Sequence, residues 1–77
     1  MEEIIGVIKL FSGNFIPRGY HKCDGTSLKV VDHQTLYSII GNQYGGDGRE
    51  HFKLPNIEAP EGTSYIICEF GVYPSRS

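Results

Sequence analysis

The abundance of glycine limits this chain to short structural elements joined by turns. Ten of its 77 residues are glycine, nearly double the average share of about 7%. Glycine reaches positive φ angles that other residues avoid, so it is the usual residue of tight turns. A chain of this length has room for one hydrophobic core. We therefore predict a single turn-rich domain spanning residues 1–77.

Two apolar segments near the two ends of the sequence are predicted to be strands. Ile4–Phe11 is apolar on both alternating faces apart from Lys9, and β-branched residues are frequent in it. This pattern predicts a strand that is buried on both sides. Tyr65–Phe70 has the same strand-like character. We expect these N- and C-terminal strands to pair with each other.

A hairpin is predicted in the part of the sequence that separates these two strands. Tyr20–Cys23 is a short strand candidate that leads into Asp24-Gly25. An Asp-Gly pair readily adopts the positive φ angles of a tight hairpin turn. Ser27–Val31 would then be the returning arm of the hairpin.

One helix is predicted from about His33 to Ile40. Asp32 before it is a suitable N-cap, because a carboxylate accepts the free amide hydrogens of the first turn. Val31 and Leu36 have the spacing of a hydrophobic staple. Gly41 stands where a left-handed residue commonly ends a helix. Short strands and a hairpin with one α-helix make a small α+β domain.

Composition and charge exclude several classes of function. The net charge is −2 and the basic residues are scattered, so the chain has no stripe that would bind nucleic acid. No apolar run approaches the roughly 20 residues that span a bilayer, so we expect no membrane insertion. The sequence starts Met1-Glu2-Glu3, which is acidic where a secretory signal is basic. We expect synthesis in the cytoplasm without a signal peptide.

The cysteines and histidines do not form a recognisable metal motif. Cys23 and Cys68 permit one disulfide or two free thiols, and the apolar neighbours of Cys68 favour small core residues. The histidines, His21, His33 and His51, fall in three separate elements, whereas zinc ligands come in close pairs. His21 and Cys23 could offer two ligands on one strand face, but a surface histidine beside a buried cysteine is the favoured interpretation. We predict no metal and no cofactor; a metal site would require symmetry to bring the histidines of several chains together.

Each of the three aspartates has a structural explanation. Asp24 lies in a turn, Asp32 before a helix, and Asp47 in the loop Gly45–Gly48. That loop lacks the Lys-Ser/Thr ending of a P-loop and the spaced acids of an EF-hand, so its glycines most simply shape the backbone. The sequence contains no nucleophile elbow and no HExxH motif. We predict that the protein is not an enzyme and has no catalytic residue.

Five aromatic and basic residues are candidates for a contact surface, namely Tyr20, Tyr44, Tyr73, Arg18 and Arg76. Aromatic residues are enriched at protein interfaces. In so small a fold, however, tyrosine and phenylalanine more often belong to the core.

Six motifs follow one another in a specific order, namely Gly6–Tyr20, Cys23–Gly25, Gln34–Gly41, Tyr44–Gly48, Phe52–Asn56 and Tyr65–Ser77. This order resembles the phage tail collar family, whose members include tail-fibre proteins and bacterial proteins labelled microcystin-dependent. Relatives commonly have Trp where this chain has Tyr20. They also carry a long insertion after the Leu-Pro motif, where this chain has only the short segment 58–63.

The resemblance implies a scaffold whose motif residues set turns, a cap and a core cysteine, namely Gly19, Tyr20, Cys23, Asp24, Gly25, Asp32, Gly41, Tyr44, Gly45, Gly46, Asp47, Gly48, Leu54 and Pro55. It also implies a structural or attachment module of a phage tail fibre or tail-derived particle, located in the virion. Such a module would form homo-oligomers, with a trimer favoured, and would contact other tail proteins.

Two alternatives remain open. One is a stand-alone module that binds a surface glycan or a protein through the loop residues Asn42, Tyr44, Asp47 and Arg49. Loops held on a rigid scaffold commonly carry recognition. The other is a small bacterial accessory protein that keeps the fold and regulates an intracellular process.

Overall fold

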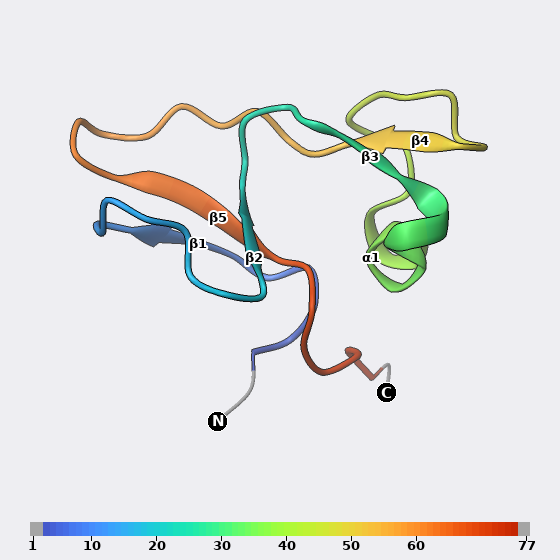
Figure 1. Cartoon of the computed structure of the whole chain (residues 1–77), viewed down its shortest axis with the longest axis horizontal. Coiled ribbons are helices and arrows are strands. Elements are labelled where there is room, and N and C mark those ends of the chain that lie inside the picture. The colour runs from blue at the N-terminus through green and yellow to red at the C-terminus, as the bar shows by residue number, and fades with distance from the viewer. Residues whose placement is uncertain (1–2, 76–77) are drawn as a thin grey trace.

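The computed structural model describes residues 3–75 and confirms a small α+β fold. The described part of the chain contains five short strands, one 3₁₀ helix and one α-helix (Figure 1). In chain order they are β1 (Ile8–Phe11), β2 (Tyr20–Lys22), β3 (Ser27–Lys29), η1 (Val30–Asp32), α1 (Gln34–Ile40), β4 (His51–Lys53) and β5 (Ser64–Cys68).

The first and last strands pair, as predicted. β1 and β5 are antiparallel, with Ile8 opposite Ile67, and β2 pairs with the other edge of β5. The strand order is therefore β1-β5-β2. Ile66, Ile67 and Cys68 of the central strand are at most 1% exposed, so β5 is covered on both faces. The last strand of the structure is thus the centre of its larger sheet.

The prediction that Ile4–Phe11 is a strand buried on both sides is wrong. Only Ile8–Phe11 is a strand, and Lys9 and Leu10 within it are exposed. Gly6, with a φ of 94°, turns the chain before the strand begins. Since β1 is an edge strand with one neighbour, its outer side chains remain in contact with water.

The predicted hairpin is also wrong. β2 pairs with β5, whereas β3 pairs with β4, placing Leu28 opposite Phe52. Gly25 has the expected positive φ of 82°. A type I′ turn also requires a positive φ at Asp24, but only glycines in the described chain have one, so this turn is excluded. The Asp24 carboxylate instead accepts hydrogen bonds from the amide and the hydroxyl of Thr26. These bonds make a corner that sends the chain away from β2.

The predicted helix is confirmed, but its predicted cap is not. α1 begins at Gln34, and the N-cap position is His33, which makes no side-chain capping bond. Asp32 lies in η1 and is exposed, and Val31 is 70% exposed, so neither the cap nor the staple with buried Leu36 forms. The 3₁₀ turn, closed by the His33 amide on the Val30 carbonyl at 3.1 Å, turns these residues outward. Gly41 ends α1 at the predicted position with a positive φ of 60°, but its ψ of −149° lies outside the left-handed helical region.

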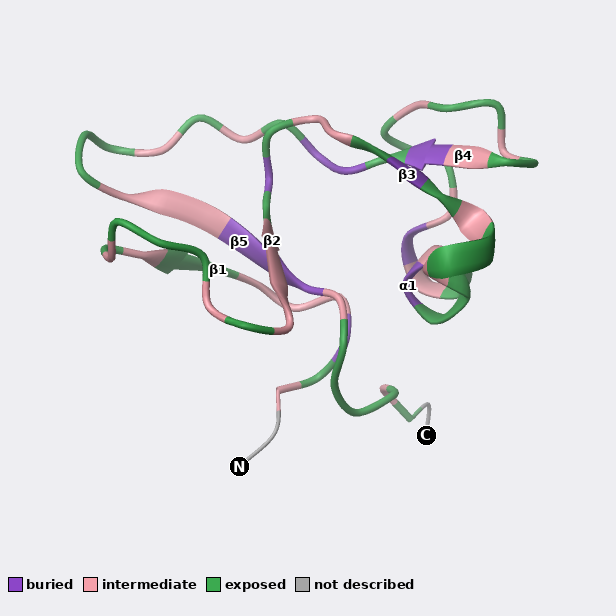
Figure 2. Cartoon of the chain, in the orientation of Figure 1, coloured by how far each residue is buried: buried purple, intermediate pink, exposed green. Residues whose placement is uncertain are grey.

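The core brings Ile67 of β5 and Cys23 together with buried side chains of α1 and β4. The largest side chains in it are Phe52, Leu36, Leu54 and Ile67, which are at most 1% exposed. Figure 2 shows buried segments on β5, on β4 and on the side of α1 turned toward the sheet. Both cysteines are buried free thiols, as favoured from the sequence. Burial raises the pKa of the Cys23 thiol to about 11. No helix between residues 3 and 75 is long and apolar enough to cross a membrane.

Candidate functional site

The glycine-rich loop, residues 42–50, folds back against β4. The Gly45 carbonyl accepts a hydrogen bond from the Lys53 amide at 3.1 Å, and the Gly48 amide donates to the His51 carbonyl at 3.1 Å. Gly46 has the positive φ expected from the sequence, 99°. A Cβ at this position would lie 2.6 Å from the Phe52 Cα. Glycine is therefore required here both by the backbone angle and by the close approach of β4.

The Asp47 carboxylate organises the tip of the loop. Its Oδ1 accepts hydrogen bonds from the amides of Arg49, Glu50 and His51 at 2.9, 2.9 and 3.0 Å. These bonds favour the charged form of the carboxylate and lower its pKa to about 2. The carboxylate that looks available in the sequence is thus already engaged by its own loop.

Two side chains, one from α1 and one from the loop, hold the loop against the helix. The Tyr37 hydroxyl donates to the Gly48 carbonyl at 2.8 Å, and its ring lies 5.2 Å from the Phe52 ring. The Gln43 amide nitrogen donates to the Ile40 carbonyl at 3.0 Å. The loop is therefore a defined surface rather than a loose connection.

The four residues predicted to form a binding loop are all exposed on this structure. Asp47 and Arg49 belong to one turn, and Asn42 lies next to Gly48, where a Cβ would come within 2.7 Å of the Asn42 Nδ2. Tyr44 is 44% exposed. The three amide hydrogen bonds of Asp47 all end on its Oδ1, so this oxygen is engaged, whereas the side chains of Asn42, Tyr44 and Arg49 extend the exposed surface beside it.

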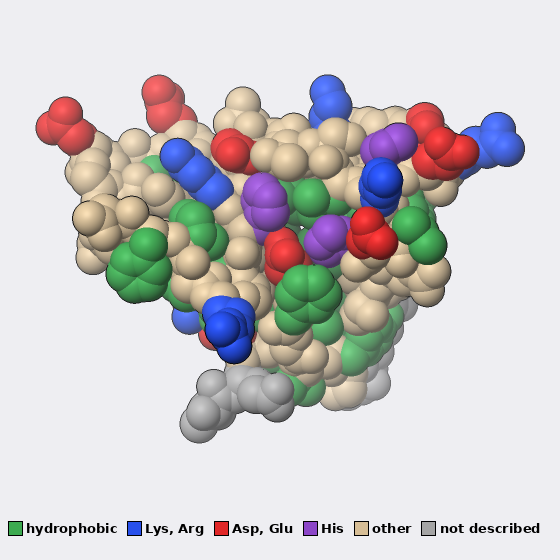
Figure 3. Space-filling model, viewed as in Figure 1, with side chains coloured by type: hydrophobic (Ala, Val, Ile, Leu, Met, Phe, Trp, Pro, Cys, Tyr) green, Lys and Arg blue, Asp and Glu red, His purple; other side chains and the backbone are tan. Residues whose placement is uncertain are grey.

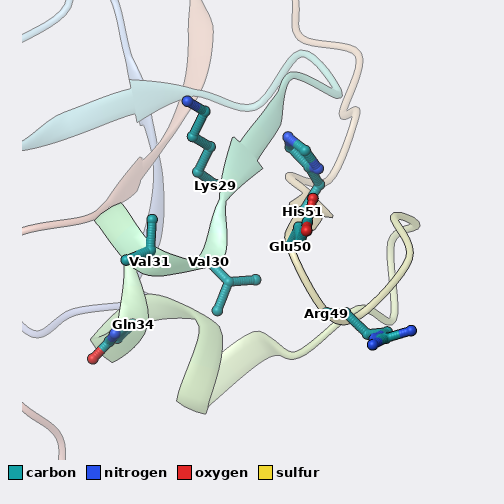
Figure 4. Close-up of a pocket in the computed structure, with 7 residues that line it drawn as sticks. All are labelled: Lys29, Val30, Val31, Gln34, Arg49, Glu50 and His51. Atoms are coloured by element: carbon teal, nitrogen blue, oxygen red, sulfur yellow. The ribbon is translucent and has the colours of Figure 1, made fainter.

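An open pocket of about 520 Å³ lies beside the loop, between η1 and the start of β4. Figure 4 shows its seven lining residues, Lys29, Val30, Val31, Gln34, Arg49, Glu50 and His51. The Arg49 and Gln34 side chains point outward in opposite directions in this view, so the polar groups do not converge (Figure 4). Ligand sites in proteins place a few polar groups around one point. This pocket lacks that arrangement.

The other residues proposed from the sequence as metal ligands or contact residues do not come together in one site. Cys23 is 2% exposed, and His21 places its Nδ1 3.0 Å from its neighbour's carbonyl, at Lys22. Across residues 3–75 no three His, Cys, Asp or Glu side chains gather as metal ligands. Tyr20 has the Lys9 ammonium over its ring at 5.0 Å, whereas Tyr73 is 57% exposed. Arg18 is exposed, and Arg76 lies outside the described residues.

Sequence reasoning missed a cluster made by His33, Glu69 and Phe70. The His33 Nε2 lies 3.6 Å from the Glu69 Oε1, and both side chains are largely buried. The Phe70 ring stacks on the His33 ring at a centroid distance of 5.7 Å. These residues are far apart in the sequence, and only the topology brings the start of α1 to the end of β5.

One comparison with known proteins is informative. The family model described as the Phage Tail Collar Domain matches residues 6–60. This segment contains β1 to β4, α1 and the glycine-rich loop, whereas β5 lies beyond it. No curated protein and no solved structure matches the chain.

Proposed function

Since the chain belongs to the phage tail collar domain family, we propose that it is an assembly module of a phage tail or tail-derived particle that forms homotrimers. Family membership implies a structural module of phage tail fibres, a family not known for catalysis. The proposal adds self-association, contact with other tail proteins, and a place in the virion.

The observation that carries this proposal is an exposed apolar patch beside the chain ends. The terminal patch consists of Ile4, Val72 and Tyr73, which are 45%, 46% and 57% exposed. Backbone pairing brings the two segments together, because the Ile5 amide donates to the Val72 carbonyl at 2.8 Å. Ile4 and Val72 are also partners in an isolated parallel β-bridge, and exposed apolar side chains that lie together are typical of surfaces that bind another chain.

The size of the accessible surface also favours association. The chain exposes 5384 Å², whereas a compact monomer of 8.6 kDa is expected to expose about 4,700 Å². Its radius of gyration is 12.3 Å, against about 11.5 Å expected for 77 residues. The chain is thus more extended than an average monomer of its mass, and more of its surface is open to a partner.

Multi-angle light scattering over a concentration series tests the proposal. We expect a stable trimer for the natural chain and dissociation of the Val72→Lys variant, because a charge in a buried interface is costly. Val31→Lys is the matched control, since Val31 is 70% exposed and lies in η1, outside the terminal patch. A natural chain that remains monomeric at high micromolar concentration would reject the proposal.

A second candidate function is attachment to a surface glycan or protein through the glycine-rich loop. The supporting observation is that Asn42, Tyr44 and Arg49 are exposed on a loop with internal hydrogen bonds. A glycan array and a pull-down with the natural chain, beside a variant with alanine at these three positions, test it. Specific binding that the variant loses supports this function, and equal binding by both proteins rejects it.

A further inference from the structure

A second exposed apolar surface lies on the outer face of the larger sheet. Side chains alternate between the two faces of a strand, and Tyr65 of β5 packs toward the core. Phe11 stands opposite Ser64, the neighbour of Tyr65, so its ring lies on the face away from the core. Phe15 and Ile16 follow in the β1–β2 connection and are 62% and 41% exposed. We call Phe11, Phe15 and Ile16 the turn patch.

The turn patch is held in a fixed shape. The Phe11 and Phe15 rings meet edge to face, with 5.5 Å between their centroids. A Cβ at Gly13 would lie 2.5 Å from the Phe11 ring and 3.3 Å from the Phe15 ring, so the turn closes tightly around both rings. An exposed aromatic side chain that is already ordered loses little entropy when a partner binds, and such residues often anchor interfaces.

The turn patch and the terminal patch carry charges of opposite sign. The formally charged residues of segment 6–23 are all cations, namely Lys9, Arg18 and Lys22. In the terminal segments, 3–5 and 69–75, the charged residues are both carboxylates, Glu3 and Glu69, of which Glu3 is the more exposed. Figure 3 shows hydrophobic side chains at the surface over β1 and the β1–β2 connection, with a Lys or Arg side chain beside them. Opposite charges fix the register of an interface and favour the correct partner.

A cyclic trimer requires two different surfaces on every chain. Copies related by a threefold axis meet head to tail, so each surface contacts a different surface of the next copy. Both surfaces must adjoin the axis, and the two patches are neighbours, because Glu3 beside Ile4 reaches the Lys9 ammonium at 3.3 Å. The other exposed large apolar side chains of the described chain belong to four separate segments, namely Leu10, Val31, Tyr44 and Phe70. None of these forms a second patch.

We propose that the turn patch receives the terminal patch of a neighbouring copy of this chain. The inference rests on the trimer proposed above, for which it names the second contact surface. Val72 and Tyr73 of one copy pack against Phe15 and Ile16 of the next, and these apolar side chains form the dry centre of the interface. The Glu3 carboxylate faces the cations that surround the Phe15 ring of that next copy.

Light scattering on single variants is the first test. Phe15→Lys should dissociate the trimer as fully as Val72→Lys, because both place a charge in the same buried interface. Leu10→Lys is the matched control and should remain a trimer. Leu10 is 47% exposed on β1 but stands opposite Tyr65, on the other face of the sheet from Phe11. A Phe15→Lys variant that remains a trimer would overturn the inference and leave the proposed assembly intact.

Mixing the two dissociated variants tests whether the contact is head to tail. Phe15→Lys keeps an intact terminal patch and Val72→Lys keeps an intact turn patch, so the two monomers should bind each other through one interface. In NMR spectra, unlabelled Val72→Lys should shift the amides of residues 4–5 and 71–73 of isotope-labelled Phe15→Lys. The reverse labelling should shift the amides of residues 11–18.

The outcomes of the mixing experiment separate the inference from the proposed assembly. A natural chain that is a trimer, with variants that show no shifts in either mixture, rejects only the head-to-tail contact between these patches. A natural chain that is a monomer rejects the assembly and the inference together. The spectra also show whether each variant is folded, and Ile16→Lys takes the place of a Phe15 variant that is not.

Discussion

The two halves of this molecule are stabilised in different ways. The sheet half, β1, β2 and β5, is held by the side chains of a central strand, and Ile66 and Ile67 are fully buried. The loop half, β3, β4, α1 and residues 42–50, also buries large side chains such as Leu36 and Phe52, but the shape of its loop depends on Gly46 at a positive φ and on Asp47, which accepts three amide hydrogen bonds. Both halves therefore depend on buried apolar volume. The loop half depends in addition on a backbone conformation that requires glycine and on a carboxylate short enough to reach the amides of its own loop.

The largest expected effect is that of Gly46→Val in the loop half. The new side chain would meet the Phe52 Cα at 2.6 Å and the His51 carbonyl at 2.7 Å. Backbone strain and overpacking together should cost about 4 kcal/mol, close to the whole stability of a small domain. Gly62→Val is the control, because Gly62 also has a positive φ but has open space around it; we expect a loss of about 1–2 kcal/mol from strain alone. Equal urea midpoints for the two variants would contradict this account.

The matching change in the sheet half is Ile66→Ala. Ile66 is fully buried in the central strand, and removing its side chain should cost about 3 kcal/mol through lost burial and a residual cavity. Leu10→Ala on the edge strand, where Leu10 is 47% exposed, should cost about 1 kcal/mol or less. Urea unfolding of both variants measures the difference. If both substitutions lower the free energy of unfolding by the same amount, β5 is not the central strand of this half.

A smaller effect is expected for Asp47→Asn, and it should depend on pH. The three amide bonds lower the pKa of Asp47 from 3.8 to about 2 in the folded chain. The folded state thus binds this proton more weakly than the unfolded state, so the stabilisation is present above pH 3.8 and is lost as the pH falls toward 2. The variant should melt at a lower temperature at neutral pH and show a flatter pH dependence in the acid range. Identical melting profiles across that range would show that the carboxylate does not organise the loop.

The smallest expected effect is that of Asp32→Ala. An N-cap aspartate contributes about 1 kcal/mol, but Asp32 lies exposed in η1 and His33 occupies the cap position. The variant should stay within about 0.5 kcal/mol of the natural chain, as surface substitutions do. Urea unfolding gives the value, and a loss near that of a true cap would restore the interpretation made from the sequence.

The same contrast explains which predictions from the sequence succeeded. Glycines at positive φ, the helix that ends at Gly41 and the pairing of the terminal strands followed from local chemistry and strong apolar patterns. The hairpin at Asp24-Gly25 failed because β2 finds its partner in β5 and not in the neighbouring segment. The local preference of Asp-Gly for a hairpin turn is weaker than the stabilisation that β2 gains by pairing with the buried central strand.

The contacts of His33 with Glu69 and Phe70 could not be predicted for a related reason. His33 and Glu69 belong to different halves, and neither stands in a motif that indicates a partner. Their contact exists because β5 ends where α1 begins, which is a property of the topology. The loop candidates Asn42, Tyr44 and Arg49 were found because they are neighbours in the sequence.

The central position of β5 also determines when this molecule can fold. β1 and β2 have no pairing with each other, and each pairs only with β5, which a ribosome synthesises after all the other strands. Until β5 emerges, β1 and β2 lack their strand partner and the backbone groups that would pair with it remain unpaired. Pairing between strands so far apart in the sequence is intrinsically slow. The nascent chain therefore cannot form its larger sheet before β5 has been synthesised. Any sequence inserted between β4 and β5 lengthens the time during which β1 and β2 are unpaired.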